Sequence, residues 1–201
     1  MKSPIKSPRR SPTTPRVREL IDAAMDLERK TMKLYCRFEN AFGKPEEVRS
    51  FWFDMAQHES RHYGALALVA GLLEGTPERN LPAATSLTPD RIAHLRKLLD
   101  GFESEARGGV DLARAFAMAV EIESSEIEDL VLDLLSALKG EAEREKAVQL
   151  LIHDLSDLTY MIEKYTTSHA LLARADELVE SQVGRLRSKP VKPAALRRIK
   201  G

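Results

Sequence analysis

The sequence predicts an all-α fold: a four-helix bundle made of two helical hairpins joined by one long crossover. Apolar residues recur at steps of three and four along four long segments, and no segment shows the alternation that is typical of a strand. Tight turns interrupt the pattern at residues 43–45 and 139–140, whereas a stretch with several prolines, at about residues 75–110, separates the second segment from the third. Short turns make neighbouring helices antiparallel, and a long crossover lets the second and third helices run parallel.

The first hairpin is predicted from two apolar stripes and the turn between them. The first helix is expected from about residue 17 to Gly43, because glycine commonly stops a helix. Pro45 favours the first turn of a second helix, expected over about residues 46–73. The stripes of the two helices include Leu20, Ala24, Leu27, Leu34, Tyr35 and Phe38, and then Val48, Phe51, Trp52, Met55 and Ala56.

The crossover and the second hairpin follow from the same signals. Within the crossover, Thr88-Pro89-Asp90 predicts the start of a short helix that ends near Glu105. The third bundle helix is expected over about residues 111–138, and Lys139-Gly140 forms the next turn. The fourth is expected to start near residue 142 and to continue to about residue 183.

Charge divides the chain of 201 residues into a body and two tails. The formal net charge is zero, with 31 Lys and Arg against 31 Asp and Glu. Residues 1–16 carry five Lys and Arg and no acid, and residues 184–201 carry seven and no acid. Residues 17–183 therefore hold 19 cations against 31 acids. We expect a disordered basic tail over residues 1–16, the bundle over residues 17–183 and a basic C-terminal tail over residues 184–201.

Composition also excludes several classes of protein. One cysteine, Cys36, rules out an internal disulfide framework and any Cys-x-x-Cys zinc or redox module. No apolar run reaches the roughly 18 residues of a membrane span, and the basic N-terminus lacks the apolar stretch of a secretory signal. The sequence thus predicts a cytoplasmic protein without a membrane partner.

Acidic residues interrupt the apolar stripes at matched positions. Glu28 and Glu59 are 31 residues apart, as are Glu123 and Asp154, and the midpoint of each pair falls on a predicted turn. In antiparallel helices each pair should lie level, about 22 Å from its turn. A single such residue is usually a boundary residue that faces water. Buried carboxylates are costly unless they are paired or bind metal.

The spacing within two helices adds two further candidates. Residues at i and i+3 point to one side of a helix, which groups His62 with Glu59 and Asp157 with Asp154. His58 and His153 precede these acids and are expected to face a neighbouring helix or water. Oxygen donors with one imidazole suit iron or manganese better than a thiolate zinc site. The predicted metal ligands are Glu28, Glu59, His62, Glu123, Asp154 and Asp157.

One stretch resembles a known family. The segment over residues 24–35, followed 31 residues after its glutamate by Glu59-Ser60-Arg61-His62, is similar to the ferritin-like superfamily and, within it, to rubrerythrin-type diiron carboxylate proteins. The resemblance covers residues 17 to about 170 and implies two iron ions. It makes Glu28 and Glu123 the lone or bridging carboxylates, and Glu59 with His62 the first Glu-x-x-His pair.

The second half departs from the family pattern. Asp154 and Asp157 stand where a second Glu-x-x-His pair belongs, so the site would be more anionic and less symmetric. A manganese pair, a single metal ion and a site without metal therefore remain open. The rubredoxin-like iron module is absent, because it needs four cysteines and the chain has one. Any electron donor would then be another protein.

The resemblance implies an oxidoreductase, peroxidase-like or ferroxidase-like, that handles peroxide, dioxygen or iron under oxidative stress. The alternative is a metal-free bundle that binds nucleic acid or an acidic partner through its basic tails. A hydroxylase or catalase on the same scaffold is a third reading, and the long fourth helix could supply a homodimer face. Whether the protein is an enzyme stays open at this point.

Overall fold

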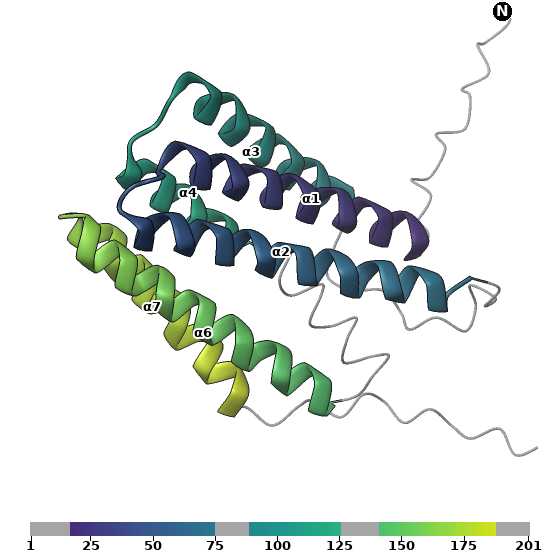
Figure 1. Ribbon diagram of the computed structural model, residues 1–201. Helices are drawn as coiled ribbons and strands as arrows, with labels where there is room; N and C mark the ends of the chain where they lie inside the picture. The colour runs from purple at the N-terminus through teal and green to yellow at the C-terminus, as the bar shows by residue number, and fades with distance from the viewer. Residues whose placement is uncertain (1–16, 75–88, 126–140, 188–201) are drawn as a thin grey trace, which may run out of the picture.

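The computed structural model describes residues 17–74, 89–125 and 141–187, and across these ranges the chain forms helices and turns without a strand (Figure 1). The predicted all-α fold is therefore confirmed. Residues 1–16 and most of the C-terminal tail lie outside the described residues. The helices are α1 (Val17–Ala41), α2 (Glu46–Leu72), α3 (Pro89–Gly108), α4 (Leu112–Glu123), α6 (Glu141–Tyr165) and α7 (His169–Arg187).

Helices α1 and α2 form the predicted antiparallel hairpin. At its open end, Arg18 of α1 donates to the backbone carbonyl of Ala70 in α2 over 3.2 Å. At its turn, Arg49 of α2 lies 3.4 Å from Glu39 of α1. The two contacts pair the start of each helix with the end of the other, which places Glu28 and Glu59 at similar heights.

Helix α3 is the short helix predicted within the crossover, and it runs parallel to α1. Arg96 of α3 lies 3.5 Å from Asp26, and Glu103 lies 3.8 Å from Arg37 further along both helices. Its buried side chains, such as Leu99, join the core on the side of α1. The helix thus covers one flank of the hairpin and leaves the other flank to α4 and α6.

Helix α4 is shorter than expected. Its start is capped by Asp111, whose carboxylate accepts from the backbone N–H of Arg114 over 2.7 Å. It ends at Glu123, because Ser124 and Ser125 form a turn in which the N–H of Ser125 bonds back to the carbonyl of Ile122. The expected continuation to residue 138 is therefore broken here, and the predicted turn at residues 139–140 lies outside the described residues.

The predicted fourth helix is wrong as a single element. It ends at Tyr165, and α7 begins at His169 and folds back along α6 (Figure 1). The hydroxyl of Thr166 donates to the carbonyl of Ile162, and the hydroxyl of Ser168 accepts from the N–H of Leu171. Side chains that bond to nearby backbone favour helix ends, so this short polar segment separates two helices of similar periodicity.

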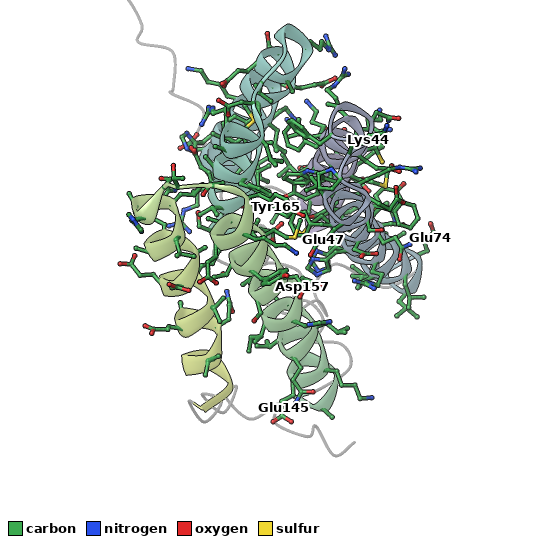
Figure 2. All side chains as sticks on the ribbon, turned by 60° about the vertical axis from the view of Figure 1, so that its left-hand side comes forward. Lys44, Glu47, Glu74, Glu145, Asp157 and Tyr165 are labelled. Carbon is green, nitrogen blue, oxygen red and sulfur yellow. The ribbon has the colours of Figure 1, made fainter. Side chains whose placement is uncertain are left out.

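Contacts with α2 show the direction of α6 and the packing of α4. Glu47, near the start of α2, accepts from Lys164 and from the Tyr165 hydroxyl near the end of α6, over 2.7 and 2.6 Å (Figure 2). Further along, His58 lies near Asp154, so α6 is antiparallel to α2. Trp52 stacks on Phe116 of α4 with ring centroids 5.3 Å apart.

The main core lies between these helices and is strongly aromatic. The rings of Tyr35, Phe38, Phe51, Trp52 and Phe116 form a continuous set of contacts across α1, α2 and α4. A smaller group of Val148, Leu151 and Leu155 packs against α7. None of the described helices is both long and apolar enough to cross a membrane.

Candidate metal centre

Three glutamates from three different helices are buried in the bundle. Glu28 of α1 and Glu59 of α2 are each 1% exposed, and Glu123, the last residue of α4, is 2% exposed. Glutamate is almost never fully buried unless it is paired. Each of the three glutamates follows or interrupts an apolar stripe. The helix packing that buries the stripe therefore buries the carboxylate as well.

These carboxylates belong to two overlapping groups of ligand atoms. Glu28, Glu59 and His62 offer atoms that all lie within 4.8 Å of one another, and so do His58, Glu59 and Glu123. Glu59 is common to both groups. One carboxylate is thus shared by two sets of three donors, as a ligand common to two metal ions would be.

The hydrogen bonds at these groups are incomplete. His62 Nδ1 lies 3.8 Å from Glu28 Oε2 and 3.7 Å from Glu59 Oε2, longer than a hydrogen bond. Among the described residues, Glu28 Oε1, Glu59 Oε1 and His58 Nδ1 are buried without a hydrogen-bond partner. A buried polar atom without a partner costs free energy, and a bound cation would remove that cost for the oxygens.

Burial shifts the protonation of two of these groups in opposite directions. Burial, reinforced by the charge of Glu28, raises the pKa of Glu59 to about 8, with His62 acting in the other direction. Burial, reinforced by nearby His62 and Arg61, lowers the pKa of His58 to about 2. The imidazole of His58 is therefore neutral at pH 7, and its lone pair is free to bind a metal ion.

Tyr35 fixes one of the carboxylates. Its hydroxyl donates to Glu123 Oε1 over 2.8 Å, linking α1 to the last residue of α4. The Tyr35 ring packs against Trp52 with centroids 5.7 Å apart. Glu123 is therefore held by a donor that the aromatic core itself positions.

The structure places the two predicted aspartates of α6 differently from each other. The Asp154 side chain is 16% exposed, and its Oδ2 lies 3.4 Å from His58 Nδ1 and 3.7 Å from Arg61. Burial raises the pKa of Asp154, and Arg61 acts against this rise. Asp154 thus lies beside the second ligand group and belongs to neither group.

Asp157 does not point inward as expected. Its side chain is 58% exposed and lies 3.9 Å from His153 Nε2 on the same helix. Helix α6 buries Leu155, Leu158 and Ile162, and Asp157 falls at the edge of the stripe that these residues form. The structure therefore brings four of the six predicted ligands together and leaves Asp157 at the surface.

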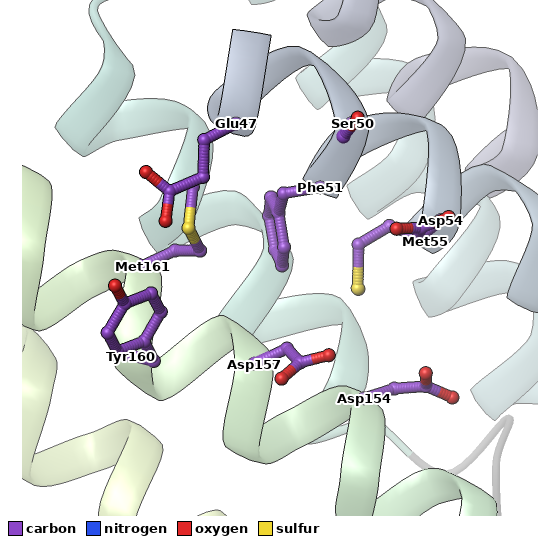
Figure 3. A pocket seen from close by; sticks show the side chains of 9 residues that line it. All are labelled: Glu47, Ser50, Phe51, Asp54, Met55, Asp154, Asp157, Tyr160 and Met161. Carbon is purple, nitrogen blue, oxygen red and sulfur yellow. The ribbon is translucent and has the colours of Figure 1, made fainter. Parts of the chain in front are cut away.

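A pocket of about 230 Å³ lies between α2 and α6 (Figure 3). Phe51 and Met55 of α2 line it opposite Asp154 and Asp157 of α6. The Asp154 carboxylate lines the pocket and also lies 3.4 Å from His58 Nδ1 of the second ligand group, so this side chain connects the two. The remaining lining residues are Glu47, Ser50, Asp54, Tyr160 and Met161.

His58 is the member of the centre that sequence patterns did not identify. Its side chain is buried, whereas that of His153, its counterpart on α6, is 71% exposed. Residues at i and i+4 share a helix face, and the rings of His58 and His62 indeed lie 4.1 Å apart. The spacing His58-Glu59-x-x-His62 was the available signal, because two histidines at this spacing on a helix can bind zinc.

Comparison of the chain with models of known protein families, with curated proteins and with solved structures finds no match.

Proposed function

We propose that this protein is a ferritin-like bundle that holds a dinuclear iron or manganese centre and uses it in redox reactions of peroxide, dioxygen or iron itself. The observation that carries the proposal is Glu59, a buried carboxylate shared by two groups of three donors. The donor types agree with the metals, because carboxylate and imidazole suit iron and manganese. Three helices, α1, α2 and α4, supply the grouped donors and α6 lies beside them, and a site between four helices is what such a bundle would have.

The buried negative charge supports binding of metal cations. Glu28, Glu59 and Glu123 bring three negative charges into a buried site when they are ionised. Burial, reinforced by the charge of Glu28, favours a protonated Glu59 in the absence of metal, as its raised pKa indicates. Two divalent ions would leave one positive charge over the three carboxylates, which would favour an anionic or polarisable oxidant, whereas one ion would leave one negative charge. Bound iron would supply the one-electron chemistry that none of these side chains can supply.

The side chains of the protein have separate roles in this proposal. Glu28 and His62 would hold one metal ion together with Glu59, and Glu59 would also serve the second ion. Tyr35 keeps Glu123 in one orientation through its hydrogen bond. Aromatic packing around Trp52 excludes water from one side of the site, while the pocket at Asp154 offers a small oxidant an approach.

Metal analysis tests the proposal directly. The full chain, reconstituted without oxygen, should contain two iron or manganese ions per chain by mass spectrometry, and Glu28→Ala should lose at least one. Asp157→Ala is the matched control, because it removes an exposed carboxylate from the same bundle and should keep both ions. Wild-type protein without stoichiometric iron or manganese, or equal metal content in all three proteins, would contradict the proposal.

A second candidate is a single zinc site of hydrolytic type, favoured by the His58-Glu59-x-x-His62 spacing alone. Such a site uses the glutamate as a general base toward water and substrate. Here Glu59 and His58 are buried, which leaves no room for a large substrate beside them. One zinc per chain, bound by both histidines, would favour this candidate. A chain that binds no metal would favour the metal-free bundle acting through its tails.

A further inference from the structure

The family pattern expects a second histidine on the last bundle helix, and this chain has Asp157 there. That residue is exposed and contacts His153 instead of the ligand groups. If the centre holds two ions, as proposed above, the second position needs another nitrogen donor or must do without one. The imidazole that is grouped with Glu123 is that of His58 on α2.

His58 is a buried imidazole that lies beside a buried carboxylate oxygen. The side chain is 2% exposed, and its Nδ1 has no hydrogen-bond partner among the described residues. Within the described ranges Asp154 Oδ2 also lacks a hydrogen bond, although it lies 3.4 Å from that nitrogen and 3.7 Å from Arg61. A small rotation of either side chain would let Nδ1–H donate to Asp154 and would satisfy both atoms.

The two ring nitrogens lie at opposite sides of the imidazole. When Nδ1 faces Asp154, Nε2 is the atom left for a metal shared with Glu59 and Glu123. A histidine that binds a metal usually donates its other N–H to a carboxylate or carbonyl, which fixes the ring and its tautomer. Asp154 is in place for that role, since it belongs to neither ligand group and touches the histidine.

The rings of His58 and His62 lie close enough together for both histidines to bind within one centre. His58 and His62 are one helical turn apart, with centroids separated by 4.1 Å and planes inclined by 61°. They nevertheless belong to different groups, one with Glu28 and one with Glu123, and share only Glu59. Helix α2 therefore offers one nitrogen to each metal position.

We infer that His58 supplies the imidazole of the second metal position through Nε2, and that Asp154 is the residue that positions it. In this chain the nitrogen missing from the last bundle helix is provided by α2, and α6 contributes a hydrogen-bond acceptor in place of a ligand. The inference rests on the proposed dinuclear centre.

Metal titration of the full chain with Zn²⁺ tests the inference. Wild-type protein should bind two ions, His58→Ala should bind one, and His153→Ala, which removes an exposed histidine next to Asp154, should bind two. Asp154→Asn should still bind two, with the second bound about 10- to 100-fold more weakly. Circular dichroism of each variant checks that the helices persist.

Nuclear magnetic resonance of wild-type protein with ¹⁵N-labelled histidine provides a measurement that needs no variant. Of the five imidazoles in the chain, two should shift strongly as two equivalents of Zn²⁺ are added. If two ions bind and only one imidazole shifts, or His58→Ala still binds two equally well, the inference fails while the dinuclear centre stands. One ion bound by both imidazoles also overturns it. Failure of wild-type protein to bind any Zn²⁺, iron or manganese removes the proposed function and the inference together.

Discussion

The metal-free protein should lose stability between pH 6.5 and pH 8, and Glu59 should be the cause. Burial, with the charge of Glu28, raises the pKa of Glu59 from 4.5 to about 8. Burial lowers the pKa of His58 from 6.5 to about 2. The folded protein therefore keeps a proton on Glu59 and none on His58 over most of the accessible pH range.

The sign and size of the effect follow from the protons bound in each state. Between pH 4.5 and 6.5 the unfolded chain holds one proton, on His58, and the folded chain holds one, on Glu59. These two residues therefore do not change the free energy of unfolding with pH in this range. Above pH 6.5 the unfolded chain holds none. The free energy of unfolding then falls by ~1.36 kcal/mol per pH unit, or about 2 kcal/mol up to pH 8. Below pH 4.5 the unfolded chain holds both protons, so stability falls again as the pH decreases.

Urea denaturation with a chelator present measures this effect. Wild-type protein and the surface variant Asp157→Asn should both lose about 2 kcal/mol between pH 6.5 and pH 8, whereas Glu59→Gln should lose much less. Saturating metal should stabilise the wild-type protein and should not stabilise Glu59→Gln, because metal binding needs the ionised carboxylate. At a metal concentration of 100 times Kd, binding adds about 2.7 kcal/mol to the free energy of unfolding. If Glu59→Gln without metal loses as much stability as the wild-type protein, the buried carboxylate is not the titrating group and the reasoning is refuted.

Three further predictions concern the scaffold of the centre, each measured by denaturation of the metal-free protein at pH 6. Tyr35→Phe removes the donor to Glu123 and should cost about 1 to 3 kcal/mol, and no change would mean that the hydrogen bond is not formed in solution. Trp52→Ala should cost about 3 to 5 kcal/mol because the ring is fully buried, while Phe53→Ala, at a 48% exposed position beside it, should change stability by roughly 0.5 kcal/mol or less. Asp111→Ala removes the cap of α4 and should cost about 1 kcal/mol, most of which Asp111→Asn should restore.

The first half of the centre could be predicted because it depends on regular geometry alone. Two helices joined by a tight turn are antiparallel, so equal distances from the turn bring Glu28 and Glu59 together. Glu59 and His62 share a face through the period of one helix. The pairing of Glu28 with Glu59 and of Glu59 with His62 does not depend on the details of side-chain packing. The structure indeed groups these three side chains. Whether they bind metal remains a prediction.

The second half depends on features that periodicity does not encode. Apolar spacing continues on both sides of residues 166–168, so the pattern indicates one helix where polar side chains separate α6 from α7. The inward direction of Asp157 was predicted from its spacing to Asp154, but the rotation of α6 about its own axis is set by which apolar residues pack. The offset of His58 from Glu59 predicts that His58 faces a neighbouring helix or water. Its position one turn before His62 indicates instead that the two histidines share a face of α2, as their ring contact shows.

The distribution of donors explains how a centre could persist with an altered last helix. Three of the five grouped donors, His58, Glu59 and His62, lie within one and a half turns of α2, so the rigid backbone of one helix fixes their spacing. The other two arrive on α1 and α4, and the Tyr35 hydrogen bond ties the α4 carboxylate to α1. Helix α6 then needs only to close the site and hold His58 through Asp154. An aspartate is adequate for that task, whereas the longer reach of a glutamate matters for a direct ligand.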